Sequence, residues 1–372
     1  MMVLTQLSGF QKDCLRKGIP FVTYQLPDTD HPITITSNSL PKILDEHLAI
    51  VPEKEGFIFA PFNKSYPSIW FDADHIYHGN DVYVKDLPDS VIPFTSNHSL
   101  PSEISKEQYL KQVESILDSI REGVISKAVL SRIIKIPFEK VLEAPALFNR
   151  LAAKFSNAFV YMLSFPEIGC WIGASPELLL SAESSNQLHS EKELLSVKTM
   201  ALAGTRHTGS SGDWGYKEID EHNWVSKYIE SVLKEVGCTS IEKSKLYTSQ
   251  AGNVEHLRTD FNAKINTDKL FNVIDSLHPT PAVCGWPATE ALNLILSVEE
   301  HDRSFYAGYL GPVNINHKTS MYVNLRCMQI TNDEAVLYAG GGITAGSYAE
   351  AEWEETTIKS RTLLTEIEKI RT

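Results

Sequence analysis

The sequence predicts an α+β fold organised as one large domain. Antiparallel strand patterns recur along the chain. The clearest is "NAFVYMLSFPEIGCWIGASPELLLSAE", residues 157–183, where two strands turn at 166–169 and lead into a third. Helical segments lie between such runs without a regular βαβ alternation, which indicates antiparallel sheets. No Pro/Gly/Ser-rich linker, internal repeat or low-complexity segment divides the chain, so we expect one domain and not two.

The first elements are short strands followed by an amphipathic helix. Apolar runs at 56–62 and 68–72, broken by Pro, Asn and Asp, predict strands and loops without a recognisable site. Residues 105–123 repeat apolar side chains with helical period and end at Gly123. The β-rich run at 125–138 predicts a strand.

The second half of the chain continues the same mixture. Residues 194–206 predict a further strand, and 320–330 and 334–343 predict a hairpin around "TNDE". We expect helices at four segments, namely 216–236, 251–264, 287–299 and 347–369. Pro287 is expected at a first helical position.

The composition is that of an ordinary globular protein with an acidic balance. The chain has 372 residues, 42% of them hydrophobic, and can bury a large core. Its 34 Lys and Arg against 47 Asp and Glu give a net charge of −13, which argues against a nucleic-acid or anionic-membrane surface. Five scattered cysteines without a C-x-x-C pair are typical of free thiols in a reducing compartment. No secretory or membrane-spanning apolar stretch is present, so we expect a cytoplasmic protein.

Two glutamate pairs have the same helical spacing. Glu352 and Glu355 lie at i, i+3 on the expected C-terminal helix with Lys359 one turn beyond, and Glu218 and Glu221 repeat that spacing on another expected helix. Like charges at this spacing repel unless a cation lies between them, so the pairs indicate solvated helix faces, neutralisation by a lysine such as Lys359, or a shared divalent cation. Oxygen ligands without a histidine cluster suit Mg²⁺.

Local signals surround the C-terminal helix. Ser347 and Glu350 have the S-x-x-E spacing of a capping box, which makes Glu350 a helix-start residue. The preceding "YAGGGITAGS" is either a tight turn or an anion site formed by backbone N–H groups, since it is neither a Walker A loop nor G-x-G-x-x-G. Arg326, on the neighbouring expected strand, is either a surface residue or a bidentate carboxylate ligand.

Four further residues remain ambiguous from pattern alone. Lys127 and Glu177 lie at ends of expected strands, where side chains can reach a shared cleft, but a solvated surface position is the default interpretation of a lone Lys or Glu. His256 and His278 are interpreted as structural histidines by default. The sequence contains no H-E-x-x-H, G-x-S-x-G or Cys/His nucleophile signature.

Eight motifs, taken in order, resemble those of the chorismate-utilising enzymes. They are "KAVLSR", "GASPELLL", "ALAGTR", "VEHLRTDF", "HPTPAVCGWP", "YAGYLGPV", "VNLRC" and "AGGGITAGS...EAEWEET...K". The similarity extends from about residue 105 to 365. It implies a single domain in which antiparallel β-sheets pack together with helices on the outside. It does not extend to residues 1–100, which we expect from their apolar runs to be a strand and loop region integrated in the fold, and it makes 101–372 the chorismate-binding catalytic region.

The resemblance also implies a role for each candidate site residue. Glu221 and Glu355 would hold Mg²⁺, with Glu218 and Glu352 beside them or bound through water, and the metal would hold the ring carboxylate of chorismate. The implied substrate-binding residues are Tyr306, Arg326 and the Gly340 backbone for the enolpyruvyl carboxylate, Lys359 for charge neutralisation, His256 near the ring, and Thr205 and Ala282.

Three positions distinguish members of this family. Lys127 stands where the water-using members carry their general base, a lysine that the ammonia-using anthranilate synthases lack. Ala203 replaces the nucleophilic lysine of aminodeoxychorismate synthases, and Ala282 replaces the threonine of pyruvate-releasing members. The resemblance therefore implies isochorismate synthesis, in which Lys127 activates water for attack at C2 and Glu177 protonates the departing C4 hydroxyl.

Three alternatives remain open at this point. A salicylate synthase would follow the same isomerisation with pyruvate elimination. An inert chorismate-binding protein would show no turnover, and an anthranilate-type component would need a glutamine amidotransferase partner. We expect no such partner and a monomer. The residues do not indicate whether menaquinone, siderophore or salicylate synthesis uses the product.

Overall fold

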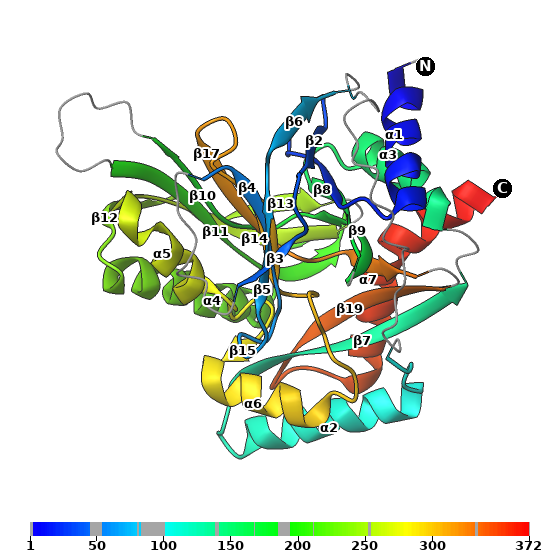
Figure 1. The fold of residues 1–372 in the computed structure, drawn as a ribbon. Coiled ribbons are helices and arrows are strands. Elements are labelled where there is room, and N and C mark those ends of the chain that lie inside the picture. Colours follow the sequence, from blue (N-terminus) through cyan, green and yellow to red (C-terminus); the bar gives the residue numbers. More distant parts are fainter. Residues whose placement is uncertain are drawn as a thin grey trace.

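Two antiparallel β-sheets packed against each other form the centre of the molecule, with helices on the outside (Figure 1). The computed structural model describes residues 3–44, 54–79, 82, 101–137, 141–166, 168–184, 194–210, 212–251, 254–331 and 334–371. The expected α+β class, with antiparallel sheets in a single domain, is confirmed.

Nine strands of the described chain form the first sheet. Their order across the sheet is β15 (Gly285–Trp286), β7 (Lys127–Pro137), β19 (Glu334–Thr344), β18 (Cys327–Ile330), β9 (Gly169–Ser175), β8 (Phe159–Phe165), β1 (Phe21–Gln25), β2 (Ile33–Thr36) and β6 (His75–His78). The long β7–β19 ladder runs from Lys127 opposite Thr344 to Pro137 opposite Glu334. Lys127 and Gly340, both candidate site residues, belong to this ladder.

The second sheet contains ten strands within the described residues. In order these are β12 (Thr239–Lys243), β14 (Val254–Asn266), β11 (Leu194–His207), β10 (Leu178–Ser184), β17 (Lys318–Val323), β16 (Tyr309–Val313), β4 (Gly56–Ala60), β5 (Ser68–Asp72) and β3 (Lys42–Leu44), with β13 (Tyr247–Ala251) paired to β14. Strands from before residue 80 therefore join both sheets.

Aromatic side chains fill the space between the two sheets. Phe159 of β8 stacks on Tyr322 of β17 with ring centroids 4.2 Å apart. Trp171 of β9 meets Phe59 of β4 edge-on at 5.7 Å. These rings are buried, and the apolar area that they remove from water is the main force joining the sheets.

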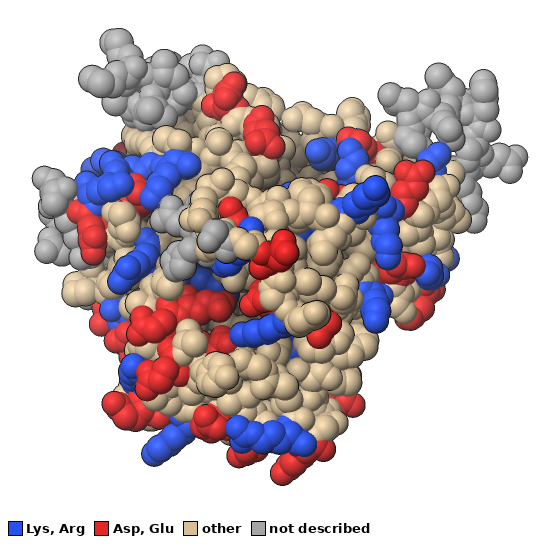
Figure 2. Space-filling view, turned by 180° about the vertical axis from the view of Figure 1, so that it is seen from behind, with Lys and Arg blue, Asp and Glu red and all other residues tan. Residues whose placement is uncertain are grey.

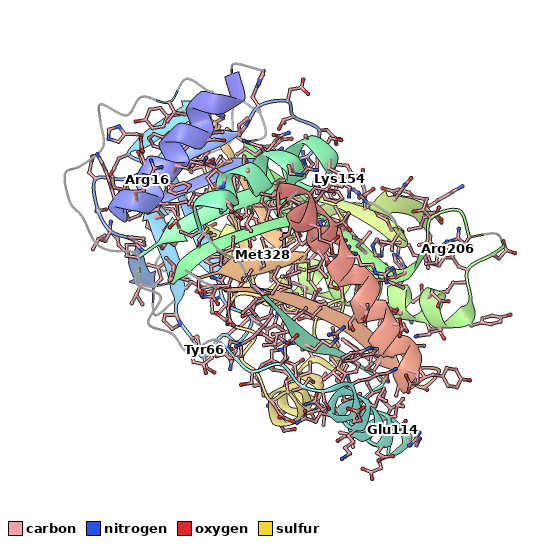
Figure 3. The ribbon with its side chains drawn as sticks, turned by 90° about the vertical axis from the view of Figure 1, so that its right-hand side faces the viewer. Arg16, Tyr66, Glu114, Lys154, Arg206 and Met328 are labelled. Carbon is pink, nitrogen blue, oxygen red and sulfur yellow. The ribbon has the colours of Figure 1, made fainter. Side chains whose placement is uncertain are left out.

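Helices cover the outer surfaces of the sheets. They are α1 (Val3–Lys17), α2 (Lys106–Arg121), α3 (Ala144–Lys154), α4 (Tyr216–Glu235), α5 (Leu270–Leu277), α6 (Ala288–Val298) and α7 (Ala349–Arg371), with 3₁₀ turns at Val141–Glu143 and Thr267–Lys269. A second apolar cluster joins α1, α3 and the end of α7 to the first sheet. Figure 3 shows α7 crossing that sheet, with the labelled Lys154 of α3 beside its C-terminal half.

The helix expected at 251–264 is wrong, because the segment is strand β14. Val254, Leu257 and Phe261 are spaced by three and four residues, which imitates a helical stripe. The structure also buries Thr259 and Ala263, so burial alternates from Leu257 onward as in a strand with one covered face. The buried polar residue Thr259 thus completes a period of two that the larger apolar residues alone concealed.

The strand expected at 320–330 is divided between the two sheets. Its first part is β17 in the second sheet and its last part is β18 in the first sheet, so only β18 forms the expected hairpin with β19. Asn324 anchors the crossing by accepting a hydrogen bond from Tyr161 Oη at 2.6 Å and donating to Phe305 O at 2.9 Å. Arg326, expected within a strand, lies at this crossing with φ = 48°.

The other expected helices are confirmed, with differences at their starts. α7 begins at Ala349, so Ser347 lies too early to be its N-cap, and its hydroxyl accepts from the Thr344 N–H at 3.1 Å. Glu350 pairs with Lys106 of α2 at 2.6 Å, so the expected capping box is wrong. Pro287 occupies the N-cap of α6, one residue before the expected position.

The surface carries charges of both signs. Figure 2 shows acidic and basic side chains interspersed over the face behind that of Figure 1. Within the described part of the chain, no helix combines the length and apolar character needed to cross a membrane.

Candidate active site

A cavity between the sheets and the starts of α4 and α7 brings most of the candidate residues together. The sequence-predicted residues that line it are Glu177, Thr205, Glu218, Glu221, His256, Ala282, Tyr306, Arg326, Gly340, Glu355 and Lys359. Lys127 and Glu352 lie behind this wall, each in contact with a lining residue. Residues far apart in sequence therefore converge because the two sheets, α4 and α7 meet here.

Glu177 is a buried carboxyl at the edge of the cavity. It lies between β9 and β10, and its backbone C=O accepts from the Val323 N–H at 3.0 Å, which fixes the segment to β17. The residue is only 4% exposed. Burial raises the pKa of Glu177 to about 8, an effect that Lys127 partly opposes. Glu177 is therefore protonated at neutral pH and can donate a proton.

Lys127 is fully buried at the first position of β7. Its Nζ lies 2.7 Å from Glu221 Oε1 on α4, an ion pair that lacks hydrogen-bond alignment. Gly342 of β19 makes room for both side chains, since a Cβ there would lie 2.6 Å from Glu221 Oε1 and 3.1 Å from Lys127 Cε. Any larger residue at 342 would displace the pair.

The three consecutive glycines of the glycine-rich segment lie in a strand, and a short turn follows only at residues 345–346. Gly340, Gly341 and Gly342 lie within β19. The Ser131 N–H, opposite Gly340, donates to Glu299, so this position of the ladder is a pair without mutual hydrogen bonds. Both backbone groups of Gly340 therefore point away from β7. Its C=O accepts from Lys359 Nζ at 2.9 Å, and its N–H lies on the same edge, beside the cavity.

Each of two further carboxylates also has a lysine partner. Glu352 accepts from Lys217 Nζ at 3.0 Å, and Glu355 pairs with Lys359 at 2.6 Å. Burial, assisted by the nearby Glu355, raises the pKa of Glu352. For Glu355 the effect of burial is outweighed by Lys359, which lowers the pKa of that carboxyl. Sequence reasoning missed Lys217, because its partner is 135 positions away.

The four glutamates fit a hard divalent cation by their chemistry. They offer oxygen ligands, and Glu352 Oε2 is buried without a hydrogen-bond partner in the described structure. Among the described residues, no three acidic, histidine or cysteine side chains come close enough together to hold a metal ion. The Mg²⁺ ligand set thus stays a prediction.

His256 of β14 presents a hydrogen-bond acceptor to the cavity. Its Nδ1 lies 2.9 Å from Gly204 O and 3.3 Å from Thr205 Oγ1. Because a carbonyl oxygen only accepts, Nδ1 carries the proton. Burial, together with Arg326 and Lys359, lowers the pKa of His256 to about 4, so the ring is neutral at pH 7 and Nε2 can accept from a hydroxyl. His278, in contrast, contacts Pro61 O at 3.0 Å and is a buried structural residue, as expected.

Arg326 and Tyr306 form the side of the cavity beside Gly340. Arg326 Nη1 donates to Thr362 Oγ1 of α7 at 2.8 Å, which holds the guanidinium at the crossing between the sheets. Burial lowers the pKa of Arg326 and raises that of the Tyr306 hydroxyl. A Cβ on Gly340 would lie 2.8 Å from Tyr306 Oη, so the glycine admits the tyrosine. Guanidinium, phenol and backbone N–H together form a suitable receptor for a carboxylate.

Ala203 and Ala282 both line the cavity. Side chains at these two positions therefore help to shape the wall of the cavity. Together with Val129, Leu202 and Val283, the two alanines form an apolar part of the cavity wall beside the charged groups.

A buried ionic network supports this wall from behind and was not foreseen. Glu299 accepts from Ser131 Oγ at 2.9 Å and from Arg303 Nη2 at 2.6 Å. Arg303 also donates to the carbonyl oxygens of Val129 and Val283, which line the cavity. The only sequence signal was the i, i+4 spacing of Glu299 and Arg303, a spacing common on solvated helices.

Comparison with known proteins identifies one family. The sequence pattern described as "Chorismate binding enzyme" matches residues 80–368. The vibriobactin-specific isochorismate synthase of Vibrio cholerae serotype O1 is 31% identical over 283 residues, which cover 71% of this chain and 68% of that protein.

Solved structures share the fold. MenF, the menaquinone-specific isochorismate synthase of Escherichia coli, superposes with a TM-score of 0.76 at 20% identity, covering 98% of this chain and 91% of that chain. Anthranilate synthase component I of Streptococcus pneumoniae gives a TM-score of 0.64 at 18% identity, covering 92% of each chain. Because both identities are low, these structures support the fold and do not distinguish one activity from another.

Proposed function

Because the chain belongs to the family of chorismate-binding enzymes, we propose that it is an isochorismate synthase, which isomerises chorismate by adding water at C2 and removing the C4 hydroxyl. One observation carries this proposal. A buried carboxyl that is protonated at neutral pH, Glu177, lines the cavity, and a buried lysine, Lys127, lies directly behind the cavity wall in contact with the lining residue Glu221. The vibriobactin-specific relative is named for the same activity.

The two residues have opposite roles in the proposed mechanism. Lys127 accepts a proton from the water that attacks C2, and Glu177 gives its proton to the C4 hydroxyl, which leaves as water while the ring double bonds shift. Atoms balance because one water enters and one leaves. To act as a base Lys127 must be neutral, so its ammonium group must first lose a proton and its ion pair with Glu221 must open before Nζ can accept a proton from water. Because the pKa of Glu177 is raised, its carboxyl group is protonated at pH 7 and can act as the acid.

The carboxylates of chorismate are assigned to the two charged sides of the cavity. Arg326, Tyr306 and the N–H of Gly340 would receive the enolpyruvyl carboxylate. His256 would accept a hydrogen bond from a ring hydroxyl through Nε2, with Thr205 holding the histidine in place. Lys359 would offset the negative charge that substrate and glutamates bring together.

Mg²⁺ is the proposed metal. Glu221 and Glu355 would hold it, with Glu218 and Glu352 beside them, and it would supply positive charge to the ring carboxylate. The chain's part is to hold these carboxylates, through Lys127, Lys217 and Lys359, until a cation binds.

The product is proposed to keep its enolpyruvyl group. Ala203 offers no nucleophilic amine and Ala282 offers no hydroxyl to the cavity, so the side chains associated with other members of the family are absent at both positions. Since the reaction uses water, no amidotransferase subunit is needed. We also propose a monomeric, cytoplasmic enzyme.

Isotope labelling tests the proposed reaction directly. Turnover of chorismate in H₂¹⁸O should give isochorismate that carries the heavy oxygen at C2, as measured by mass spectrometry. Unlabelled isochorismate would contradict water addition. Salicylate with pyruvate would instead favour the salicylate synthase alternative.

A further inference from the structure

Arg132 of β7 contacts one turn of α7 at three points. The carbon of its guanidinium lies 3.8 Å from the centre of the Trp353 ring. Its Nε donates to Thr356 Oγ1 at 2.8 Å, and its Nη2 donates to Thr357 Oγ1 at 2.9 Å. Residues 353, 356 and 357 follow i, i+3, i+4 spacing and therefore share one face of the helix. One side chain of the first sheet thus makes three contacts with this face of α7.

The donors and acceptors of the contact between Arg132 and α7 match one another. Both threonine hydroxyls donate to Trp353 O, at 2.7 and 3.0 Å, so their oxygens remain as acceptors for the arginine. The Trp353 ring also meets Tyr109 of α2 edge-on at 5.5 Å. Arg132 is 6% exposed and Thr356 is fully buried, so water does not compete for the bond between them, while the bond to Thr357 is partly buried. Rotation of α7 about its axis would break them all.

The same turn of α7 carries two proposed metal ligands. At 100° per residue, the face with Glu352 and Glu355 lies roughly 120° around the helix from the face that Arg132 holds. Fixing one face therefore fixes the direction of the other. Arg132 is not among the residues that line the cavity, so it acts on the site only through α7.

We infer that Arg132 is a positioning residue of the metal site: by setting the rotation of α7, it directs Glu352 and Glu355 toward the bound cation. This inference rests on the proposed function. It also accounts for sequence features that the mechanism leaves unused, namely the arginine that ends "KAVLSR" and the tryptophan and threonines of "EAEWEETT". A lysine could keep the charge of Arg132 but not the planar stack and the two-pronged donation.

The test compares Arg132→Lys with Arg150→Lys. Arg150 also holds α7, but at Glu366, eleven positions beyond Glu355, where Lys154 and Lys369 keep that carboxylate paired. Mn²⁺, a cation of similar ligand preference, is titrated into each substrate-free protein, and free Mn²⁺ is measured by electron paramagnetic resonance. The Mg²⁺ activation constant and kcat are measured with chorismate.

Arg132→Lys should raise the Mn²⁺ dissociation constant and the Mg²⁺ activation constant about tenfold, as expected when an outer partner of metal ligands is lost. At saturating Mg²⁺ its kcat should recover toward the wild-type value, and Arg150→Lys should leave both constants unchanged. If Arg132→Lys does not fold, Thr357→Val, which removes one acceptor and keeps the arginine, should raise both constants by a smaller factor.

Unchanged constants in a folded Arg132→Lys or Thr357→Val protein would overturn the inference. So would a loss of kcat at saturating Mg²⁺ without a change in either constant, which would indicate a general structural role. In both cases a wild-type protein that binds the metal and converts chorismate leaves the proposed function standing. A wild-type protein that does neither would overturn both.

Discussion

Lys127 Nζ and Glu221 Oε1 lie 2.7 Å apart, joining the first residue of β7 to the second turn of α4. The lysine is fully buried, and the glutamate lines the cavity. The proposed base and a proposed metal ligand therefore share one contact. Cation binding at Glu221 and release of Lys127 are expected to occur together.

Replacing Lys127 should abolish most turnover. Lys127→Met keeps much of the side chain's shape but cannot accept a proton, so we expect kcat to fall by about 10²- to 10⁴-fold. The matched control is Lys135→Met on the same strand, whose surface pair with Glu334 lies away from the cavity. Circular dichroism would verify that both variants fold. Wild-type turnover by folded Lys127→Met would remove the base assignment.

The pH dependence of activity should report the protonation of Glu177. Its pKa is raised to about 8, so the acid is present below that pH and is lost as pH rises through it. We therefore expect kcat/KM to decline above about pH 8. A profile measured from pH 6 to 9.5 that stays flat at its alkaline end would contradict Glu177 as the proton donor.

The same carboxyl should cost stability as pH rises. The unfolded carboxyl has a pKa of 4.5 and the folded one a pKa of about 8, so the folded state holds the proton more tightly and its stability falls between these values. Glu177→Gln lacks this titration. Its free energy of unfolding relative to wild type should therefore increase by up to about 1.4 kcal/mol per pH unit across that window. Denaturant unfolding at pH 5 and pH 8 measures the difference, and equal differences at both values would refute it.

Position 282 should influence whether pyruvate is released. Ala282 lines the cavity, so Ala282→Thr places a hydroxyl beside the bound substrate, as the resemblance to pyruvate-releasing enzymes suggests. We expect a higher ratio of pyruvate to isochorismate, measured with coupled lactate dehydrogenase and chromatography. Ala282→Val has nearly the same shape without the hydroxyl and should not raise that ratio. An equal ratio in both variants would show that the hydroxyl is not responsible.

Metal removal should stop turnover reversibly. Treatment with EDTA is expected to abolish activity, and added Mg²⁺ to restore it. Glu355→Gln removes one negative ligand and should raise the Mg²⁺ concentration needed for half-maximal activity by about tenfold or more. Surface Glu354→Gln, on the same helix turn, should not. Full activity in EDTA would eliminate the metal from the proposal.

Sequence patterns predicted the fold where periodicity was clear. The amphipathic helix before Gly123 and the strands around residues 157–183 follow simple periods and were confirmed. The error at β14 arose because polar residues such as Thr259 are buried there, so hydrophobicity and burial diverged. The division of 320–330 between sheets depends on Asn324 and its bonds to distant residues, which no local pattern reveals.

The sequence predicted which residues form the candidate site but not all of the ion pairs between them. The glutamate spacing placed Glu218 and Glu221 on one helix, and the resemblance added residues such as Arg326 and Tyr306, which line the same cavity. The pairing of Glu355 with Lys359 follows from their i, i+4 spacing, whereas the partners of Glu352 and Glu221 come from the tertiary structure, because Lys217 and Lys127 lie far from them in sequence. The protonation of Glu177 likewise depends on burial, which only the packed structure provides.

The central claim is tested most directly by incubating the purified protein with chorismate and Mg²⁺ while products are separated by chromatography and pyruvate is assayed. Isochorismate approaching an equilibrium mixture with chorismate, without pyruvate, is the predicted result. Stoichiometric pyruvate with salicylate, or no conversion of chorismate, would contradict it.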